Sequence, residues 1–205
     1  KYLIAHSKEE TFLVIDNTCM SCMFQPYSLI FGKRTHLRLI TFESLNKYHQ
    51  FGLDRVTGGI ILATGGDTQK LFDYREHLGT NILDIAVSSL PTPNRKILTK
   101  RLLRHQRNAT ILAARLQQWI GNNLKSAFSA ISFPVLPHHP SYTWTKDNAF
   151  HGSYFTIQFN KKYRNIASFK RFVNAVIHVA KRHRVDIVSG TSFGMNTTRI
   201  YLTAM

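Results

Sequence analysis

The chain has 205 residues, of which 43% are hydrophobic and 19% charged, an ordinary globular composition with enough apolar side chains for a core. Because 27 Lys and Arg stand against 11 Asp and Glu, the formal net charge is +16, which favours anionic partners such as nucleic acid, an acidic membrane surface or phosphorylated ligands. No apolar run is long enough to span a membrane, and charged residues interrupt residues 1–15 where a signal peptide needs an apolar segment, so we expect a cytoplasmic protein.

Three apolar runs in the first third of the chain predict buried strands, at residues 11–15, 37–42 and 60–64. Polar residues or glycines follow each run, which is typical of strand ends. Because the runs are apolar at successive positions, both faces of each strand should be buried. We therefore predict an α/β fold in which helices cover a sheet on both sides.

Apolar residues at three- and four-residue spacing predict helices at 68–78 and 96–120, the second long enough to bridge two domains. Residues 133–140 contain three prolines and are predicted to be extended. The patterns in the remaining chain predict a small α+β layer, made of a helix at 166–182 and strands at 153–159, 186–189 and 199–203.

The two cysteines, Cys19 and Cys22, form a C-x-x-C pair. A zinc site would need a second pair of ligands, and a redox motif would need to open a helix, so we interpret the pair as reduced thiols in a loop. His138 and His139 are adjacent, but no cluster of Cys or carboxylate ligands accompanies them. We therefore interpret them as loop histidines and not as metal ligands.

Two charged residues, Asp16 and Lys47, come just after predicted strands. In a parallel sheet, ligands bind at the carboxyl ends of the strands, so both side chains would face the same crevice. A desolvated lysine amine there is nucleophilic toward an aldehyde, and a carboxylate can keep a ring nitrogen protonated; pyridoxal phosphate needs both. Ser44, three residues before Lys47, could place a hydroxyl on the cofactor phosphate. From the spacing alone, a polar turn and a solvated charge in an unassigned α/β domain explain the same residues.

Five segments follow one another in the order of motifs known from one enzyme family: V-I-D-N-T at 14–18, S-L-N-K-Y at 44–48, D-R-V-T-G-G at 54–59, R-H-Q-R-N-A at 104–109 and V-L-P-H-H-P at 135–140. In these segments the chain resembles the cystathionine γ-synthase/methionine γ-lyase family of Cys/Met-metabolism enzymes, which use pyridoxal phosphate and have fold type I. The resemblance extends over nearly the whole chain.

The resemblance implies roles for the cofactor-binding residues. Lys47 would carry pyridoxal 5′-phosphate as a Schiff base and then move protons at the substrate Cα. Asp16 would pair with the pyridinium nitrogen, and Ser44 would contact the phosphate. Thr18 and Asn46, within the same two motifs, would also contact the cofactor, although the family usually has Thr where Asn46 stands.

The resemblance also implies an amino-acid substrate and a reaction class. Ser189 and Arg199 would hold the substrate α-carboxylate, since a guanidinium grips a carboxylate with two parallel hydrogen bonds. The reaction would be elimination or replacement at the β or γ carbon of a sulfur-containing or related amino acid. No metal is implied.

The resemblance further implies an aspartate aminotransferase-like architecture. Residues 1–95 would be the C-terminal part of the cofactor-binding large domain, 96–121 a connecting helix and 122–205 a small C-terminal α+β domain. The N-terminal half of the family's fold is missing, and the sequence starts at Lys1 without an initiator methionine. We therefore expect a fragment, a processed chain or one piece of a split protein, working in a homo-oligomer built as a dimer of dimers.

Two other functions stay open. The chain could be a non-catalytic relative that serves as a scaffold or partner subunit, which the missing half and the charge of +16 favour. It could also be a basic nucleic-acid-binding domain, because six of the thirteen residues at 95–107 are basic. We do not favour nucleic-acid binding, because no helix-turn-helix or stacked-aromatic motif accompanies the charge.

Overall fold

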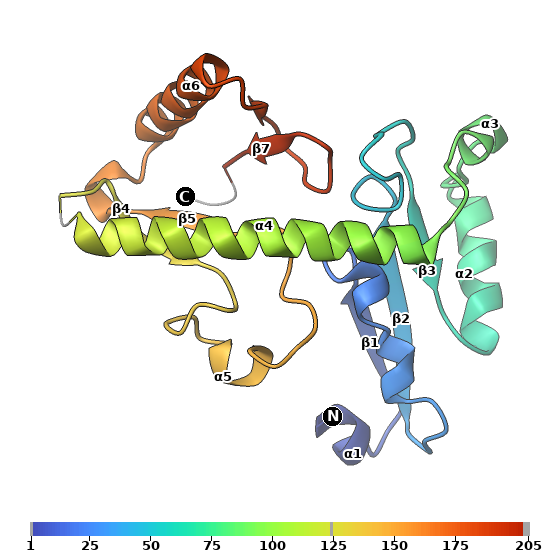
Figure 1. The fold of residues 1–205 in the computed structure, drawn as a ribbon. Helices are drawn as coiled ribbons and strands as arrows, with labels where there is room; N and C mark the ends of the chain where they lie inside the picture. The colour runs from blue at the N-terminus through green and yellow to red at the C-terminus, as the bar shows by residue number, and fades with distance from the viewer. Residues whose placement is uncertain (1, 124, 203–205) are drawn as a thin grey trace. The chain divides into compact units, whose positions relative to one another are not determined.

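The computed structural model describes residues 2–123 and 125–202, which divide into two compact units, Lys1–Leu98 and Thr99–Met205 (Figure 1). The boundary falls in the first turn of α4 (Arg95–Asn122), so nearly all of this long helix belongs to the second unit. None of the helices in the described ranges is long and apolar enough to cross a membrane.

The first unit is built on a sheet of β1 (Thr11–Asp16), β2 (Leu37–Ser44) and β3 (Gly59–Leu62), in that order. β1 and β2 pair in parallel, whereas β3 runs antiparallel to β2. The three predicted strands are confirmed, but only the β1–β2 pair has the parallel arrangement on which the expected ligand edge depends. The other elements of the unit are α1 (Tyr2–His6), the 3-10 turns η1 (Ser21–Met23) and η2 (Pro26–Leu29), α2 (Gly66–His77) and α3 (Asp84–Ser88).

Alternation along β1 and β2 gives this part of the sheet one more buried face and one accessible face, whereas β3 is exposed on both faces. On the accessible face, which we call the open face, four apolar side chains are 39–62% exposed: Phe12, Val14, Phe42 and Ile61. The prediction of a sheet covered on both sides is therefore wrong for the residues that the structure describes. The apolar periodicity marked these residues correctly as candidates for burial, but helices of the described chain do not bury them.

Gly59, the first residue of β3, lies close to the backbone of β2. A Cβ at Gly59 would lie 3.2 Å from the backbone oxygen of Glu43, which is closer than most Cβ contacts. At Gly58, a Cβ would lie 2.9 Å from Cδ1 of Ile82, whose side chain lies outside the sheet.

The second unit combines α4 with two small sheets and α6. β4 pairs antiparallel with β5, and β6 pairs parallel with β7. The elements after α4 are β4 (Phe128–Ser132), α5 (Tyr142–Thr145), β5 (Thr156–Phe159), the 3-10 turn η3 (Lys161–Tyr163), α6 (Ile166–Arg182), β6 (Ile187–Ser189) and β7 (Thr198–Ile200).

The core of the second unit lies between α4 and β4. Ala109, Ala113 and Ile120 recur at helical spacing on α4 and pack with Ile131 and Phe133. Small residues on the helix let the strand approach closely. Other apolar residues of the pattern that predicted α4, among them Ile111, Leu112 and Trp119, are 47–49% exposed.

α6 begins and ends where the sequence predicted, at residues 166 and 182. The side chain of Asn165 accepts a hydrogen bond from the N–H of Ser168 at 2.9 Å and caps the first turn. The amphipathic periodicity and the Asn165 cap are both local signals, which is why the helix could be predicted from the sequence.

Residues 133–140 are not extended, contrary to the prediction. They form consecutive turns, in which the N–H of Leu136 donates to the oxygen of Phe133 at 3.0 Å and that of His139 to the oxygen of Leu136 at 2.8 Å. Proline fixes φ at a value that suits the first central position of a turn as well as an extended chain. The strand predicted at 153–159 is shorter, as β5, and the one predicted at 199–203 is β7, with Thr203 outside the described residues.

Charge is divided unevenly between the two units. Residues 99–205 contain 16 Lys and Arg but two Asp and Glu, a formal charge of +14, whereas residues 1–98 contain 11 and nine. In this positive environment His105 of α4 is half-buried, and its Nε2 is buried without a hydrogen-bond partner among the described residues. Burial, with the nearby charges of Arg101 and Arg104, lowers the pKa of His105 from 6.5 to about 4.

This shift predicts an acid-sensitive second unit. Between pH 6.5 and about 4 the unfolded chain protonates His105 while the folded chain does not, so the free energy of unfolding falls with pH by about 3 kcal/mol. In urea unfolding at a series of pH values, His105→Gln should lose this part of the pH dependence. His178→Gln, on the exposed side of α6, should keep it. Equal pH dependence in His105→Gln and the wild type would contradict the shift.

Candidate cofactor site

The carboxyl ends of β1 and β2 lie at the same edge of the sheet, because the two strands are parallel. Past β1, the N–H of Asn17 still donates to the oxygen of Phe42 at 2.9 Å. One residue further, the hydroxyl oxygen of Thr18 accepts a hydrogen bond from the N–H of Ser44 at 2.9 Å. A side chain therefore continues the pairing where the backbone ladder stops.

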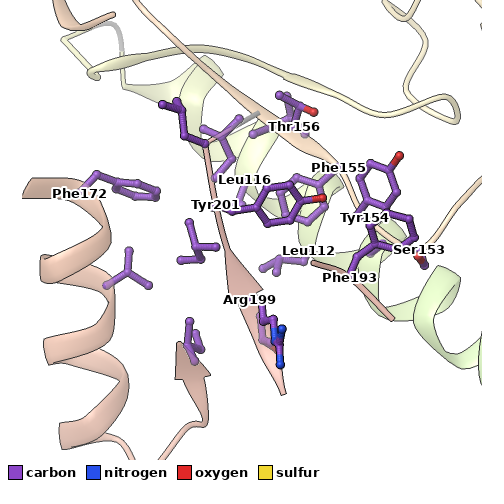
Figure 2. Close-up of a pocket in the computed structure, with 18 of the residues that line it drawn as sticks. Leu112, Leu116, Ser153, Tyr154, Phe155, Thr156, Phe172, Phe193, Arg199 and Tyr201 are labelled. Atoms are coloured by element: carbon purple, nitrogen blue, oxygen red, sulfur yellow. The ribbon is translucent and has the colours of Figure 1, made fainter. Parts of the chain in front are cut away.

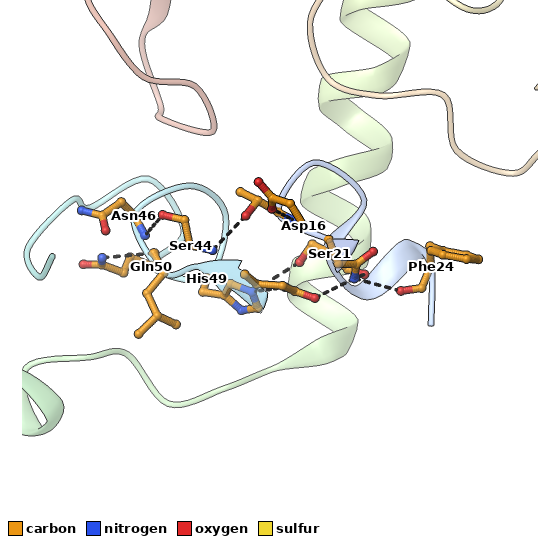
Figure 3. Close-up of polar contacts among 11 residues, drawn as sticks. Asp16, Ser21, Phe24, Ser44, Asn46, His49 and Gln50 are labelled. Atoms are coloured by element: carbon orange, nitrogen blue, oxygen red, sulfur yellow. Dashed lines mark hydrogen bonds and ion pairs between the residues drawn. The ribbon is translucent and has the colours of Figure 1, made fainter. Parts of the chain in front are cut away.

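Asp16 and Ser44 share the open face of the sheet. Asp16 is opposite Phe42 in the register, and Ser44 lies two residues beyond Phe42, so alternation directs both side chains to the same face (Figure 3). The N–H of Thr18 donates to Oδ1 of Asp16 at 2.9 Å, which orients the carboxylate while Asp16 stays exposed. An acid and a hydroxyl thus stand together at the strand ends.

Asn46 organises the loop that leaves β2. Its N–H donates to the hydroxyl of Ser44 at 3.3 Å, and its amide oxygen accepts from the N–H of Gly58 at 3.1 Å. Its amide nitrogen also lies 3.4 Å from the hydroxyl of Thr57. The amide therefore ties the loop to the start of β3, and its predicted phosphate contact stays a prediction.

Lys47 lies in the same loop, three residues after Ser44, and is half-buried. Its neighbours Leu45 and Tyr48 are buried, and the N–H of Leu45 donates to the oxygen of Gly58 at 2.9 Å. Because the chain is anchored on either side of it, the backbone of Lys47 is fixed close to the edge that carries Ser44.

Gln50 holds the rest of this loop together from inside. It is 1% exposed, and its amide oxygen accepts from the N–H groups of Arg55 and Val56 at 2.8 and 2.9 Å. Its amide nitrogen donates to the oxygens of Val56 and Leu45 at 2.6 and 3.2 Å. Phe51, with a φ of 53°, lies within this loop in the left-handed region that non-glycine residues avoid, and the bonds of Gln50 offset that strain.

A second polar network joins the strand ends on the opposite, buried face. The amide of Asn17 donates to Glu43 at 2.7 Å, and Nε2 of His49 lies 2.6 Å from the same carboxylate (Figure 3). Burial raises the pKa of Glu43, but the hydrogen bonds from His49 and Asn17 outweigh it, so the pKa lies below its ordinary value. Glu43 is therefore an anion that ties β2 to both flanking loops.

Sequence reasoning missed Glu43, His49 and Gln50. Isolated polar residues after a strand are usually exposed, and only the tertiary contacts of this loop bury them. For Gln50, the local sequence does not specify which backbone groups its amide bonds.

The predicted substrate residues Ser189 and Arg199 lie in the second unit. On the parallel pair of β6 and β7, Arg199 is opposite Val188 and Ser189 is opposite Ile200, so the two side chains leave the sheet on opposite faces. Arg199 packs over Gly190, where a Cβ would lie 2.8 Å from its Cδ. The structure does not bring Ser189 and Arg199 to one face.

Cys19 and Cys22 are half-buried thiols, the second within η1. Over residues 2–123 and 125–202, no group of three or more His, Cys, Asp or Glu side chains is arranged to hold a metal ion.

The sequence model of the family described as Cys/Met metabolism PLP-dependent enzyme matches residues 2–185. The chain belongs to this family. The resemblance seen in the five motifs is confirmed, and the cofactor that the family implies is pyridoxal 5′-phosphate. The match ends before Ser189 and Arg199, whose roles remain predictions.

Solved structures of the family have the same fold. Cystathionine gamma synthase from Xanthomonas oryzae pv. oryzae aligns with a TM-score of 0.65 and 23% identity over 92% of this chain. Cystathionine gamma-lyase from Lactobacillus plantarum aligns with a TM-score of 0.57 and 21% identity over 92% of it. At these identities the likeness shows the fold alone, and it confirms the predicted α/β architecture of fold type I.

The chain spans less than half of its relatives. It covers 43% of each of those two structures. A bifunctional enzyme of Aspergillus flavus, named flvA, is 26% identical over 195 residues, which is 94% of this chain and 22% of that enzyme. The residues described above are therefore one part of what the larger relatives contain.

Replacing Gln50 tests whether it holds the Lys47 loop. Gln50→Leu should lower the free energy of unfolding by about 3 kcal/mol, because buried backbone groups of the loop lose their partners. Gln69→Leu, on the exposed surface of α2, is the matched control and should change it by less than about 0.5 kcal/mol. Urea unfolding measures both, and a similar small effect of the two changes would show that Gln50 is dispensable.

Proposed function

We propose that this chain provides the lysine and the acid of a pyridoxal-phosphate site, with Lys47 as the Schiff-base lysine and Asp16 as the partner of the ring nitrogen. The observation that carries the proposal is the position of Asp16, Ser44 and the Lys47 loop at one edge of the sheet in a member of this family. Thr18 and Asn46 complete the proposed cofactor contacts.

The chemistry of these side chains fits the cofactor. An amine is needed for its aldehyde, a carboxylate for its ring nitrogen, and hydroxyl or amide donors for its phosphate. Lys47, Asp16 and Ser44 offer one group of each kind, and the second hydrogen of the Asn46 amide nitrogen adds a donor. The loop that carries Lys47 is fixed by Gln50 from inside, which supports a role that requires a constant position.

When bound, the cofactor supplies an electron sink for negative charge at the substrate Cα. Asp16 would keep a proton on the ring nitrogen through its negative charge, and the amine of Lys47 would remove and return protons at the substrate carbon atoms. We infer elimination or replacement at the β or γ carbon of a sulfur-containing or related amino acid. Arg199, with Ser189 nearby in sequence, is the proposed contact of the substrate α-carboxylate.

The open face supports a site that further polypeptide completes. Phe12, Val14, Phe42 and Ile61 on this face are accessible beside Asp16 and Ser44, and the chain covers 43% of the cystathionine gamma synthase structure. We propose that the N-terminal half of the family's fold covers this face in a homo-oligomer built as a dimer of dimers. Residues 1–95 would then belong to the large domain, 96–121 to the connecting helix and 122–205 to the small domain.

Cofactor attachment tests the proposal directly. Pyridoxal phosphate added to the chain and reduced with borohydride should become fixed on the peptide that contains Lys47, as read by mass spectrometry. Lys47→Ala should lose this label and the accompanying absorbance near the visible edge. Lys70→Ala, an exposed lysine of α2, is the control and should keep both. A retained band in Lys47→Ala, or equal labelling of Lys47 and Lys70, would count against the proposal.

A second candidate is a non-catalytic relative that serves as a partner subunit or scaffold. The amide of Asn46, bonded to Thr57 and Gly58 where the family usually has Thr, favours it. Amino-acid turnover by the chain in its complete assembly would exclude it.

A third candidate function is nucleic-acid binding, which the charge of +14 over residues 99–205 favours. An absence of RNA or DNA binding at low salt would exclude this third function.

A further inference from the structure

One face of α4 in the second unit is accessible along its length. Six exposed side chains recur on it at three- and four-residue spacing, and we call them the outer stripe: Lys100, Leu103, Arg107, Ile111, Ala114 and Gln118. At 1.5 Å per residue the outer stripe runs for about 27 Å along the helix. It lies opposite the buried residues Ala109, Ala113 and Ile120, because the two sets are about half a helical turn apart.

A different side of α4 lines the cavity of the second unit. Leu112 and Leu116 line this cavity together with Phe172 of α6 (Figure 2). None of the six residues of the outer stripe is among the residues that line it. The outer stripe is therefore a separate surface, which has no part in the cavity or in the proposed substrate contacts.

The outer stripe contains large aliphatic side chains, where a solvated helix face usually carries polar ones. Leu103 is 40% exposed and Ile111 is 49% exposed. They are eight residues apart, a little more than two helical turns, so they lie on the same side of the helix. The small side chain of Ala114 follows them and allows the backbone of another helix to come close. This pattern suits the packing of a second helix along α4.

Cationic side chains alternate with the aliphatic ones in the outer stripe. Lys100 and Arg107 are seven residues apart, the interval at which side chains of one helix meet those of a paired helix. α4 contains no Asp or Glu, and neither cation forms an ion pair with a residue that the structure describes. Residues 99–205 include two acidic residues, Asp147 and Asp186, and both are exposed elsewhere. The second unit thus leaves these cations accessible to an anionic partner.

We propose that the outer stripe binds an acidic amphipathic helix of a partner protein. Apolar side chains of that helix pack against Leu103 and Ile111, and its carboxylates pair with Lys100 and Arg107. The interaction goes beyond the proposed function, since it involves neither Lys47 nor the cofactor.

The mixture of side chains selects this partner over other anionic ones. Nucleic acid is bound mainly through phosphates and base edges, which Leu103 and Ile111 do not complement. A helix that lies on a membrane has a continuous apolar face with its cations on the opposite face, whereas here cations interrupt the aliphatic side chains. A second copy of the chain would bring like charges of the two outer stripes together.

Fluorescence anisotropy of a labelled peptide tests the proposal on the whole chain without pyridoxal phosphate. The probe is a helical peptide of about 20 residues, long enough to cover the outer stripe, with Leu at three- and four-residue spacing and Glu beside each Leu. It should bind saturably. A peptide with Ser in place of Leu should bind at least tenfold more weakly because it lacks the apolar contacts, and so should one with Lys in place of Glu, because the outer stripe repels it.

Matched variants locate the binding surface. Ile111→Gln should weaken binding of the Glu peptide at least tenfold, whereas Val179→Gln, 51% exposed on α6, should leave it unchanged. Arg107→Glu should weaken binding of the Glu peptide and strengthen binding of the Lys peptide. Lys170→Glu, exposed on α6, makes the same change of net charge and should alter neither affinity by more than about twofold. Far-UV circular dichroism confirms that each variant is folded.

Several results would overturn the proposal. Absence of saturable binding by the Glu peptide would show that the outer stripe accepts no such helix, and equal losses in Ile111→Gln and Val179→Gln would place the contact elsewhere. Polyglutamate that binds as tightly as the Glu peptide would show that charge alone attracts it. RNA binding, vesicle binding or self-association that Ile111→Gln abolishes, without binding of the Glu peptide, would assign the surface to nucleic acid, a membrane or a second copy.

Discussion

The parallel pairing of β1 with β2, extended by the bond from the N–H of Ser44 to Thr18, is the constraint on which the first unit depends. It brings residues that are 26 positions apart to one edge and fixes which side chains share a face. A shift of the register between β1 and β2 by one residue would place the side chains of Asp16 and Ser44 on opposite faces of the sheet. The buried network of Glu43 stabilises this register from the other face, so both faces of the strand ends specify one arrangement.

Local patterns predicted those elements whose signals are local. The strands and α6 follow from periodicity and capping, and the positions of Asp16 and Lys47 after strands follow from the same patterns. The turns at residues 133–140 could not be predicted, since proline suits turns and extended chain alike. The role of Gln50 could not be predicted either, because its four backbone partners meet only after the loop has folded.

The open face shows what sequence periodicity does and does not specify. Apolar residues such as Val14 and Ile61 indicate that a surface is made for burial, but not which polypeptide buries it. The larger relatives, of which this chain spans less than half, make a contribution from other polypeptide a natural explanation. The family assignment does not depend on that contribution, because the matched segment runs through both compact units.

The uneven distribution of charge means that dissolved ions act oppositely on the two units. In the first unit, Arg38 pairs with Glu10 at 3.0 Å and with Asp67 at 2.7 Å, and screening weakens such attractions. In the second unit, 16 cationic side chains face two acidic ones, and the same screening relieves their mutual repulsion. Raising the ionic strength therefore weakens the ion pairs of the first unit and also weakens the charge repulsion within the second. Lowering the ionic strength strengthens both interactions.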